Sequence, residues 1–206
     1  MKKYSMIIYT LLFLILFSVS NSFAVDFGFY LDFGGGSGEA EFDVAYSEEF
    51  DIDTNYFNLG FQFETNPLTP KNVFSYRFQA GFERRDIEDE EDTTLELGGL
   101  VINNTFSFGG NVSEKIRLWG GPQILVGFYS GETDKEYLGD EISYSGFGFG
   151  LGIAGGANFG LGSSAILTTT IGVRGVGIAG QAEWYDEDEA LTGNLSEVFF
   201  SIGMLF

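Results

Sequence analysis

Large apolar side chains occupy every second position in segment after segment of this chain. The first such segment sets Phe27, Phe29, Leu31 and Phe33 against Asp26, Gly28, Tyr30 and Asp32. Similar alternation runs through residues 57–64, 74–83, 116–129, 147–153 and 197–206. A repeat of two residues is that of a β-strand with one apolar face, whereas an α-helix repeats every 3.6 residues. The sequence therefore predicts an all-β protein.

Two less regular segments bring the number of predicted strands to eight. In residues 95–108 and 167–178 the apolar positions change phase partway, at Gly98-Gly99 and at Gly175. A β-bulge inserts one extra residue into a strand, and a glycine inside a strand often marks one. We therefore expect a bulge at each of these two phase breaks.

The two faces of the predicted strands differ in chemistry. One face carries uniformly large apolar residues, and the other mixes Gly with Arg, Glu, Asp and Gln. The alternative is a secreted β-sandwich with the Phe face inward, but runs of about ten residues suit a tilted membrane strand better. In hydrocarbon every backbone N–H and C=O must be paired within the protein, so a membrane sheet has to close on itself. We predict an eight-stranded antiparallel up-and-down transmembrane β-barrel, apolar outside and polar inside.

A barrel of this kind carries aromatic side chains at both membrane interfaces. Near one rim we expect Phe27, Phe63, Phe74, Phe108 and Phe206 on the outside. Near the other rim we expect Phe33, Phe57, Phe82, Phe128, Phe147 and Trp184.

The first 24 residues have the pattern of an export signal. Lys2 and Lys3 precede the apolar run 6–17, and Ser22-Phe23-Ala24 supplies small residues for a cleavage site. A permanent membrane helix is the alternative, but the run falls short of the ~20 residues that cross a bilayer. We predict a signal peptide over 1–24 and a barrel domain over 25–206.

The connections between the predicted strands alternate between short turns and longer acidic loops. Residues 66–71, 109–115 and 160–164 form the short turns, which suits a periplasmic rim. The long loops contain Glu39, Glu41, Asp43, Glu48, Glu49, Asp51 and Asp53; residues 86–92; Glu132, Asp134, Glu136, Asp140 and Glu141; and residues 186–189. We expect these loops to be solvated outside the cell, or alternatively to bind divalent cations or a basic surface partner. The net charge of −20 argues against nucleic acid as a partner.

The polar face of the strands would fill the barrel interior. Charges out of water are costly unless paired, so we expect an interior charge network. Its members are Asp32, Glu64, Arg77, Glu83, Arg117, Arg174 and Glu197. An eight-stranded barrel is just wide enough for side chains to fill, which favours a closed plug over a charged lining for solute passage.

The sequence lacks two residue types that are common in catalytic and zinc sites. The chain contains neither His nor Cys, so it offers no Ser-His-Asp or Cys-His nucleophile system and no His or Cys ligand for zinc. We expect no enzymatic activity, no cofactor and no dedicated metal site.

The ending Val198–Phe206 and the Gly-aromatic run Gly146–Gly152 are the most specific parts of the sequence. With the strand count and spacing, they resemble the small outer-membrane barrels typified by the OmpA transmembrane domain, OmpX and OmpW. The resemblance implies a monomer in outer-membrane lipid of a bacterial cell. It also implies that Phe200, Ile202, Met204 and Phe206 form the signal read by the barrel-assembly machinery. No motif indicates one subfamily, so no functional site is carried over.

The leading hypothesis is a non-enzymatic outer-membrane barrel with a structural or surface-interaction role. The alternative is a narrow channel or transporter for small solutes, apolar ones included, as in OmpW-like proteins. A lumen cavity lined by Tyr30, Trp119 and Tyr129 would favour transport. A lumen filled by arginine–carboxylate pairs would favour the structural role.

Overall fold

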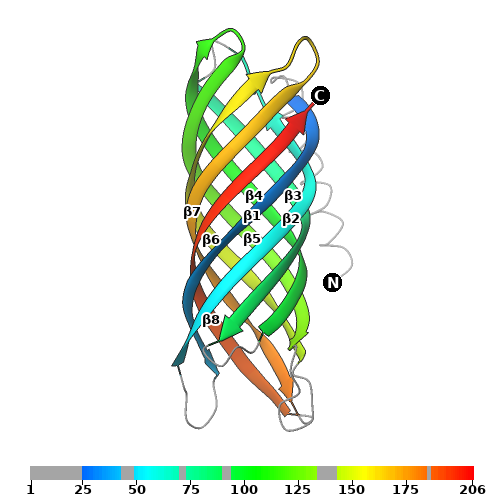
Figure 1. The fold of residues 1–206 in the computed structure, drawn as a ribbon, viewed down its shortest axis with the longest axis vertical. Helices are drawn as coiled ribbons and strands as arrows, with labels where there is room; N and C mark the ends of the chain where they lie inside the picture. Colours follow the sequence, from blue (N-terminus) through cyan, green and yellow to red (C-terminus); the bar gives the residue numbers. More distant parts are fainter. Residues whose placement is uncertain (1–24, 43–48, 70–72, 90–93, 134–142, 185–186) are drawn as a thin grey trace, which may run out of the picture.

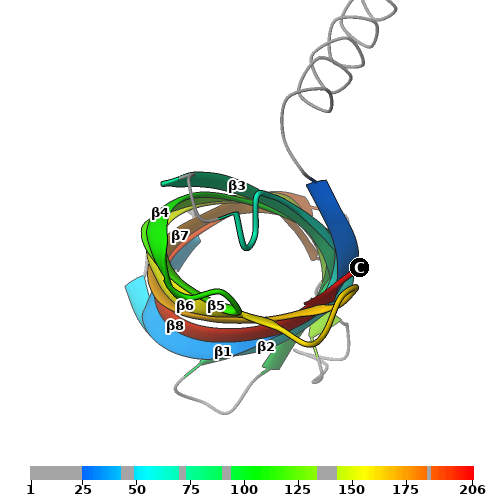
Figure 2. The same cartoon turned by 90° about the horizontal axis from the view of Figure 1, so that it is seen from above.

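Eight antiparallel strands close into one barrel in the computed structural model of the chain (Figures 1 and 2). The structure describes residues 25–42, 49–69, 73–89, 94–133, 143–184 and 187–206. The strands are β1 (Val25–Phe42), β2 (Glu49–Thr65), β3 (Phe74–Asp89), β4 (Thr94–Ser113), β5 (Ile116–Thr133), β6 (Ser143–Gly160), β7 (Ile166–Trp184) and β8 (Glu187–Leu205). The predicted fold class is confirmed, and the predicted signal peptide lies outside the described residues. No helix in the described part of the chain is long and apolar enough to cross a membrane.

Each strand pairs with its neighbours in sequence, and β8 pairs with β1 to close the sheet. The seam extends to the last residue, where the Phe206 N–H donates to the Phe27 carbonyl at 2.7 Å. Closure leaves no open sheet edge along the described strands. Val25 and Phe206 lie at one end of the barrel, the terminal rim, together with residues 66–69, 114–115 and 161–165 (Figure 1). The opposite end is called the acidic rim.

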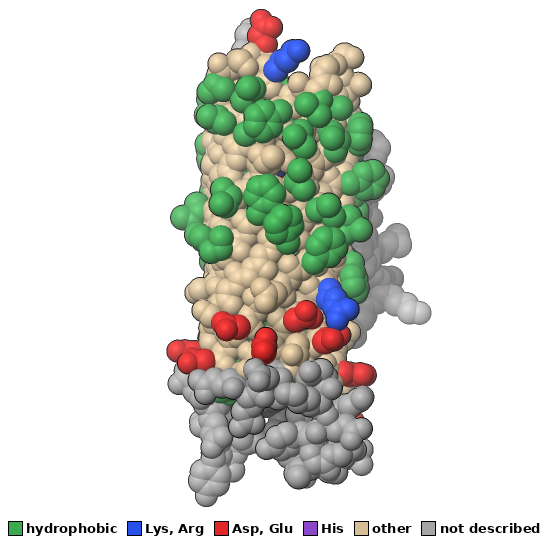
Figure 3. Space-filling model, in the orientation of Figure 1, with side chains coloured by type: hydrophobic (Ala, Val, Ile, Leu, Met, Phe, Trp, Pro, Cys, Tyr) green, Lys and Arg blue, Asp and Glu red, His purple; other side chains and the backbone are tan. Residues whose placement is uncertain are grey.

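The outside of the barrel carries a broad apolar belt. Large side chains that are more than a third exposed on it include Phe27, Phe29, Phe33, Phe57, Leu59, Phe61, Phe82, Leu100, Phe128, Phe147, Phe149, Ile153, Ile171, Val198 and Phe206. Figure 3 shows apolar side chains gathered over the part of the visible face nearer the terminal rim. A patch of this size does not face water in a soluble monomer, so the belt requires an apolar solvent.

The expected orientation of the aromatic residues is confirmed where the structure describes their side chains. Of the two predicted sets, Phe63 is partly buried among outward neighbours, and the rest are exposed on the outside. The Trp184 side chain lies outside the described residues. The secreted sandwich is ruled out, because the sheet is a closed barrel with its phenylalanines outward.

Towards the acidic rim the strands continue beyond the apolar belt, and their two faces exchange character. Outward positions there form an acidic collar of exposed polar side chains: Ser37, Glu39, Glu41, Asp51, Asp53, Glu88, Glu96, Glu132, Glu183, Asn194 and Ser196. In Figure 3, a band of acidic side chains lies on the side of the apolar belt away from the terminal rim. Inward positions form an apolar neck core: Ala40, Ile52, Leu97, Val101, Leu125, Tyr129, Tyr144, Val176, Ile178 and Leu195. The membrane pattern of the belt thus becomes the pattern of a barrel in water.

This exchange corrects the predicted bulges. The register is continuous through Gly99, which faces Glu83 and Tyr129, and through Gly175, which faces Leu151 and Ser196. Among the described strand pairs, the register shifts between Asn111 and Ser113, near the terminal rim. The change of apolar phase in β4 and β7 therefore marks the start of the neck core and not an inserted residue.

The long strands also correct the predicted loops. Most acidic residues assigned to loops lie on strands: Glu39, Glu41, Glu49, Asp51, Asp53, Asp86, Glu88, Asp89, Glu132 and residues 187–189. The connections at the acidic rim shorten to 43–48, 90–93, 134–142 and 185–186. The other predicted loop carboxylates fall in those connections, outside the described residues. Beyond the belt the large apolar residues move to the inward face and become sparser, so the outward alternation did not extend into these parts of the strands.

The exchange of faces predicts that truncating one leucine of β4 lowers the unfolding free energy much more than truncating another. Leu97 is 1% exposed in the neck core, whereas Leu100 is 51% exposed on the belt. Leu97→Ala leaves a cavity and should cost about 2–5 kcal/mol of unfolding free energy. Leu100→Ala should cost about 1 kcal/mol, because only its contact with the surrounding apolar solvent is lost. Urea unfolding of both variants in lipid vesicles measures the difference. Equal losses would contradict the proposed exchange.

Candidate functional site

All seven charged residues predicted for the interior point inward, and each is at most 3% exposed: Asp32, Glu64, Arg77, Glu83, Arg117, Arg174 and Glu197. They do not form one network. The ion pairs of the described residues divide them into a group near the terminal rim and a group near mid-height. Arg117 belongs to neither group.

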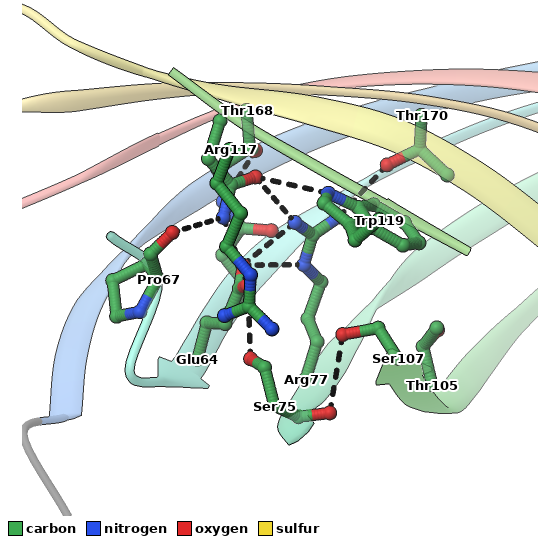
Figure 4. Close-up of polar contacts among 12 residues, drawn as sticks. Glu64, Pro67, Ser75, Arg77, Thr105, Ser107, Arg117, Trp119, Thr168 and Thr170 are labelled. Atoms are coloured by element: carbon green, nitrogen blue, oxygen red, sulfur yellow. Dashed lines mark hydrogen bonds and ion pairs between the residues drawn. The ribbon is translucent and has the colours of Figure 1, made fainter. Parts of the chain in front are cut away.

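The group near the terminal rim is centred on the Glu64 carboxylate. Arg77 binds Glu64 Oε2 through Nη2 at 2.6 Å and through Nε at 2.9 Å. The other oxygen, Oε1, accepts from Ser75 Oγ at 3.0 Å and from Asn158 Nδ2 at 2.9 Å. Figure 4 shows these side chains converging from different strands. A buried carboxylate is stable here because both oxygens are hydrogen-bonded.

The Arg77 guanidinium is held as completely as its partner. Its Nη1 donates to Thr170 Oγ1 at 2.8 Å, and its Cζ lies 4.5 Å from the centre of the Trp119 ring. Trp119 in turn donates from Nε1 to Asn158 Oδ1 at 3.1 Å. Cation–π contact and hydrogen bonds together replace the water that this cation loses.

The group at mid-height is centred on Glu197. Its Oε2 accepts from Arg174 Nε at 2.7 Å, and its Oε1 accepts from Arg85 Nη1. Arg85 also donates from Nε to Glu83 Oε1 at 3.0 Å. Asp32 is the outlying member, with its Oδ2 4.0 Å from Arg174 Nη1. Three carboxylates and two guanidinium groups from β1, β3, β7 and β8 therefore meet across the lumen.

Aromatic rings fill the space around this group. The Tyr56 ring lies between the two arginines, 4.7 Å from Arg174 Cζ and 5.0 Å from Arg85 Cζ. The Tyr129 hydroxyl donates to Glu83 Oε1 at 2.9 Å. The guanidinium groups are thus in contact with π faces as well as carboxylates.

Glycines make room for these rings. A Cβ added to Gly148 on β6 would lie 3.0 Å from the Tyr129 ring, tighter than almost any real Cβ contact. On β7 a Cβ added to Gly172 would lie 2.5 Å from the Phe199 ring. Inward glycines therefore give neighbouring side chains the space to cross the lumen.

Arg117 departs from the prediction, because its partners are backbone groups. Its Nη1 donates to the Asn66 carbonyl at 2.6 Å and its Nη2 to the Val73 carbonyl at 3.1 Å. No carboxylate in the described part of the chain forms an ion pair with it. Arg117 therefore forms no ion pair within the network among the described residues, although Glu64 and Arg77 are near enough to act on its charge. Its hydrogen bonds hold the β2–β3 connection.

The three aromatic residues that would line a transport cavity are packed instead. Tyr30 is 1%, Trp119 6% and Tyr129 4% exposed, and each hydroxyl or indole N–H donates a hydrogen bond. The Tyr30 hydroxyl donates to Asn58 Oδ1 at 3.0 Å. In this structure these rings help to fill the lumen.

Sequence reasoning missed two members of the mid-height group, Arg85 and Tyr56. Both continue the inward phase of their strands by one repeat, Arg85 after Glu83 and Tyr56 before Asn58. The signal was available, since extending the alternation past Phe82 places Arg85 inside. It was hidden by the acidic run that follows, which has the composition of a loop.

The described residues contain no group of three or more His, Cys, Asp or Glu arranged to hold a metal ion. Glu64, Glu83 and Glu197 are engaged by arginine or amide donors. Asp32 is held less closely, because among the described residues its Oδ1 has no hydrogen-bond partner. The arrangement therefore stabilises the barrel and fills much of its interior.

Comparison with known proteins identifies solved structures with a similar fold. No protein-family model and no curated protein matches the sequence. The crystal structure of the outer membrane protein OprG from Pseudomonas aeruginosa is similar, with a TM-score of 0.58 and 11% sequence identity over 88% of this chain and 95% of that chain. Neisserial surface protein A is a weaker match, with a TM-score of 0.34 and 13% identity over 84% and 95% of the two chains. The chain has the fold of the small eight-stranded outer-membrane barrels.

The central position of Glu197 predicts a large effect of its removal. Glu197→Gln leaves two buried arginines without their shared anion, which should cost about 3–5 kcal/mol of unfolding free energy. Glu183→Gln, on the exposed collar, is the matched control and should change stability by less than about 0.5 kcal/mol. Urea unfolding in lipid vesicles gives both values. Similar values for the two variants would show that the ion pairs do not stabilise the barrel.

Proposed function

We propose that this protein is a non-enzymatic barrel of a bacterial outer membrane with a structural or surface-interaction role. The apolar belt supports a position in lipid, and the fold likeness to OprG supports the outer membrane. The terminal rim then faces the periplasm and the acidic collar faces outward, the usual orientation of such barrels. One chain closes its own sheet, which is consistent with a monomer.

The end of β8 supports assembly by the outer-membrane machinery. Phe200, Ile202 and Phe206 are exposed on the outside, at 38%, 37% and 66%, and Met204 lies between the latter two on the same face. An assembly factor could read this apolar edge before β8 pairs with β1. The proposed signal therefore depends on residues that make few interior contacts.

The observation that carries the structural role is the filled lumen. Buried ion pairs occupy its middle and its terminal end, and the apolar neck core occupies the acidic end. Solute passage would have to separate buried charges, which is costly.

Planar-bilayer recording tests closure directly. The refolded protein should show no steady ion conductance in 1 M KCl, because buried ion pairs and packed side chains occupy the lumen. Glu197→Gln, which disrupts the mid-height group, should raise the frequency of transient openings. Stable unitary steps from the unmodified protein would contradict the closed barrel and favour a channel.

The alternative function, transport of small solutes including apolar ones, has one observation in its favour. The inward face of the neck is apolar, with Leu97, Leu125 and Leu195 each at most 2% exposed. An apolar lining suits apolar solutes, but here these side chains contact one another. Uptake of such a solute by proteoliposomes, beyond the rate of protein-free vesicles, would favour transport.

The acidic collar is the proposed interaction surface. A groove of about 810 Å³ crosses β8, β1, β2 and β3 on it, and its lining includes Glu39, Asp51, Asp53, Glu88 and Asp89. Such a surface attracts a basic protein segment or divalent cations. Both kinds of partner carry positive charge, which complements the acidic collar. A basic protein segment would also contact the groove.

Neutralising the groove should weaken binding of a cation. The variant Glu39→Gln/Asp51→Asn/Asp53→Asn/Glu88→Gln should bind an oligolysine peptide at least tenfold more weakly than the parent at low salt, by analogy with other electrostatic contacts. Glu114→Gln, an exposed change at the terminal rim, is the control. Binding is measured by fluorescence anisotropy with the protein in nanodiscs, and calcium is added as a competitor. Unchanged affinity of the fourfold variant would remove the groove as a binding surface.

A further inference from the structure

The start of the connection between β2 and β3, residues 66–69, turns into the barrel. Its first residue, Asn66, has a backbone φ of 54°, a left-handed conformation that Asn tolerates better than most residues. Asn66 is 3% exposed and Pro67 is buried. Viewed along the barrel, the segment projects into the ring of strands (Figure 2). The turn therefore covers part of the opening at the terminal rim.

Side chains from three other strands hold this turn by its carbonyl groups. Arg117 of β5 binds the carbonyls of Asn66 and Val73, at 2.6 and 3.1 Å. Asn158 of β6 donates to the Pro67 carbonyl at 3.0 Å, and Asn111 of β4 donates to the Leu68 carbonyl at 2.9 Å. Neither β5 nor β6 neighbours β2 or β3 in the sheet. The contacts therefore reach across the mouth of the lumen.

Arg117 is an unusual choice for a purely structural contact. It is fully buried, yet among the described residues its partners are neutral carbonyls and its Nε has no hydrogen-bond partner. A buried cation that lacks an ion pair loses hydration, which carbonyl groups and the more distant Glu64 carboxylate only partly replace. Moving the turn outward would return water to the Arg117 guanidinium. The free energy that favours the closed position is therefore smaller than it would be if Arg117 formed an ion pair with the turn.

We propose that residues 66–69, at the start of the β2–β3 connection, form a lid over the terminal mouth of the lumen, latched by Arg117 and controlling access to the polar group around Glu64 and Arg77. Asn158 links the two, since it binds both the Pro67 carbonyl of the lid and Glu64 below it. The lid is separate from the mid-height group, so it governs entry from one side and not conduction through the barrel.

Access to a single thiol below the lid tests this proposal. The chain has no cysteine, and Ser107, 2% exposed beside Ser75 in the polar group, can be replaced by Cys with little change in size. In the refolded full-length mature barrel in micelles, N-ethylmaleimide should react with Ser107→Cys at least tenfold more slowly than with Ser37→Cys on the collar. Adding Arg117→Met should raise the Ser107→Cys rate at least tenfold, and Arg117→Lys should give an intermediate rate.

Controls separate the lid from general loosening. Arg84→Met removes an exposed arginine at the other end of β3 and should leave the rate unchanged. Asn111→Ala, which removes only the contact to Leu68, should give about a threefold increase and serves if Arg117→Met does not fold, as judged by heat-modifiable gel mobility. The proposal is overturned if the Ser107→Cys thiol reacts as fast as Ser37→Cys in the parent, or if neither latch variant changes its rate.

Discussion

The solvent outside the barrel changes along its length, and the direction of the apolar side chains changes with it. Beside the belt the outside is apolar, so the polar and charged side chains must lie within. Beyond the belt the outside is polar, and Ile52, Leu97 and Leu195 turn inward as in a soluble barrel. Continuous strands pass from one regime to the other without a register shift at the boundary. The rest of the architecture follows from this single exchange.

Filling the lumen is the consequence of placing charges inside a narrow barrel. Each buried carboxylate needs donors, and each guanidinium needs an acceptor or a π face, so partners accumulate until little space remains. Glu64 with Arg77 and Glu197 with Arg174 are the clearest pairs. The polar interior is thus a structural core, comparable in role to the apolar core of a soluble domain.

The sequence predicted the strands of the belt because lipid imposes a strict period of two on them. It was less informative where that constraint ends. The phase breaks at Gly98-Gly99 and Gly175 resembled bulges, since a bulge and an exchange of faces leave the same pattern in one dimension. Arg117 was assigned to the charge network because its inward phase was evident, whereas its backbone partners depend on how the β2–β3 turn folds. Side-chain direction was predictable, and the choice of partner was not.

The two closures of the lumen differ in the kind of contact that must break. At mid-height, opening separates arginines from Glu197 in a buried setting, and each broken pair leaves an uncompensated charge at a cost of about 3–5 kcal/mol. At the terminal rim, opening breaks hydrogen bonds from Arg117 to carbonyl groups, and water replaces both partners as they separate. The terminal mouth should therefore open first and most often, while the mid-height group stays closed and keeps the barrel sealed.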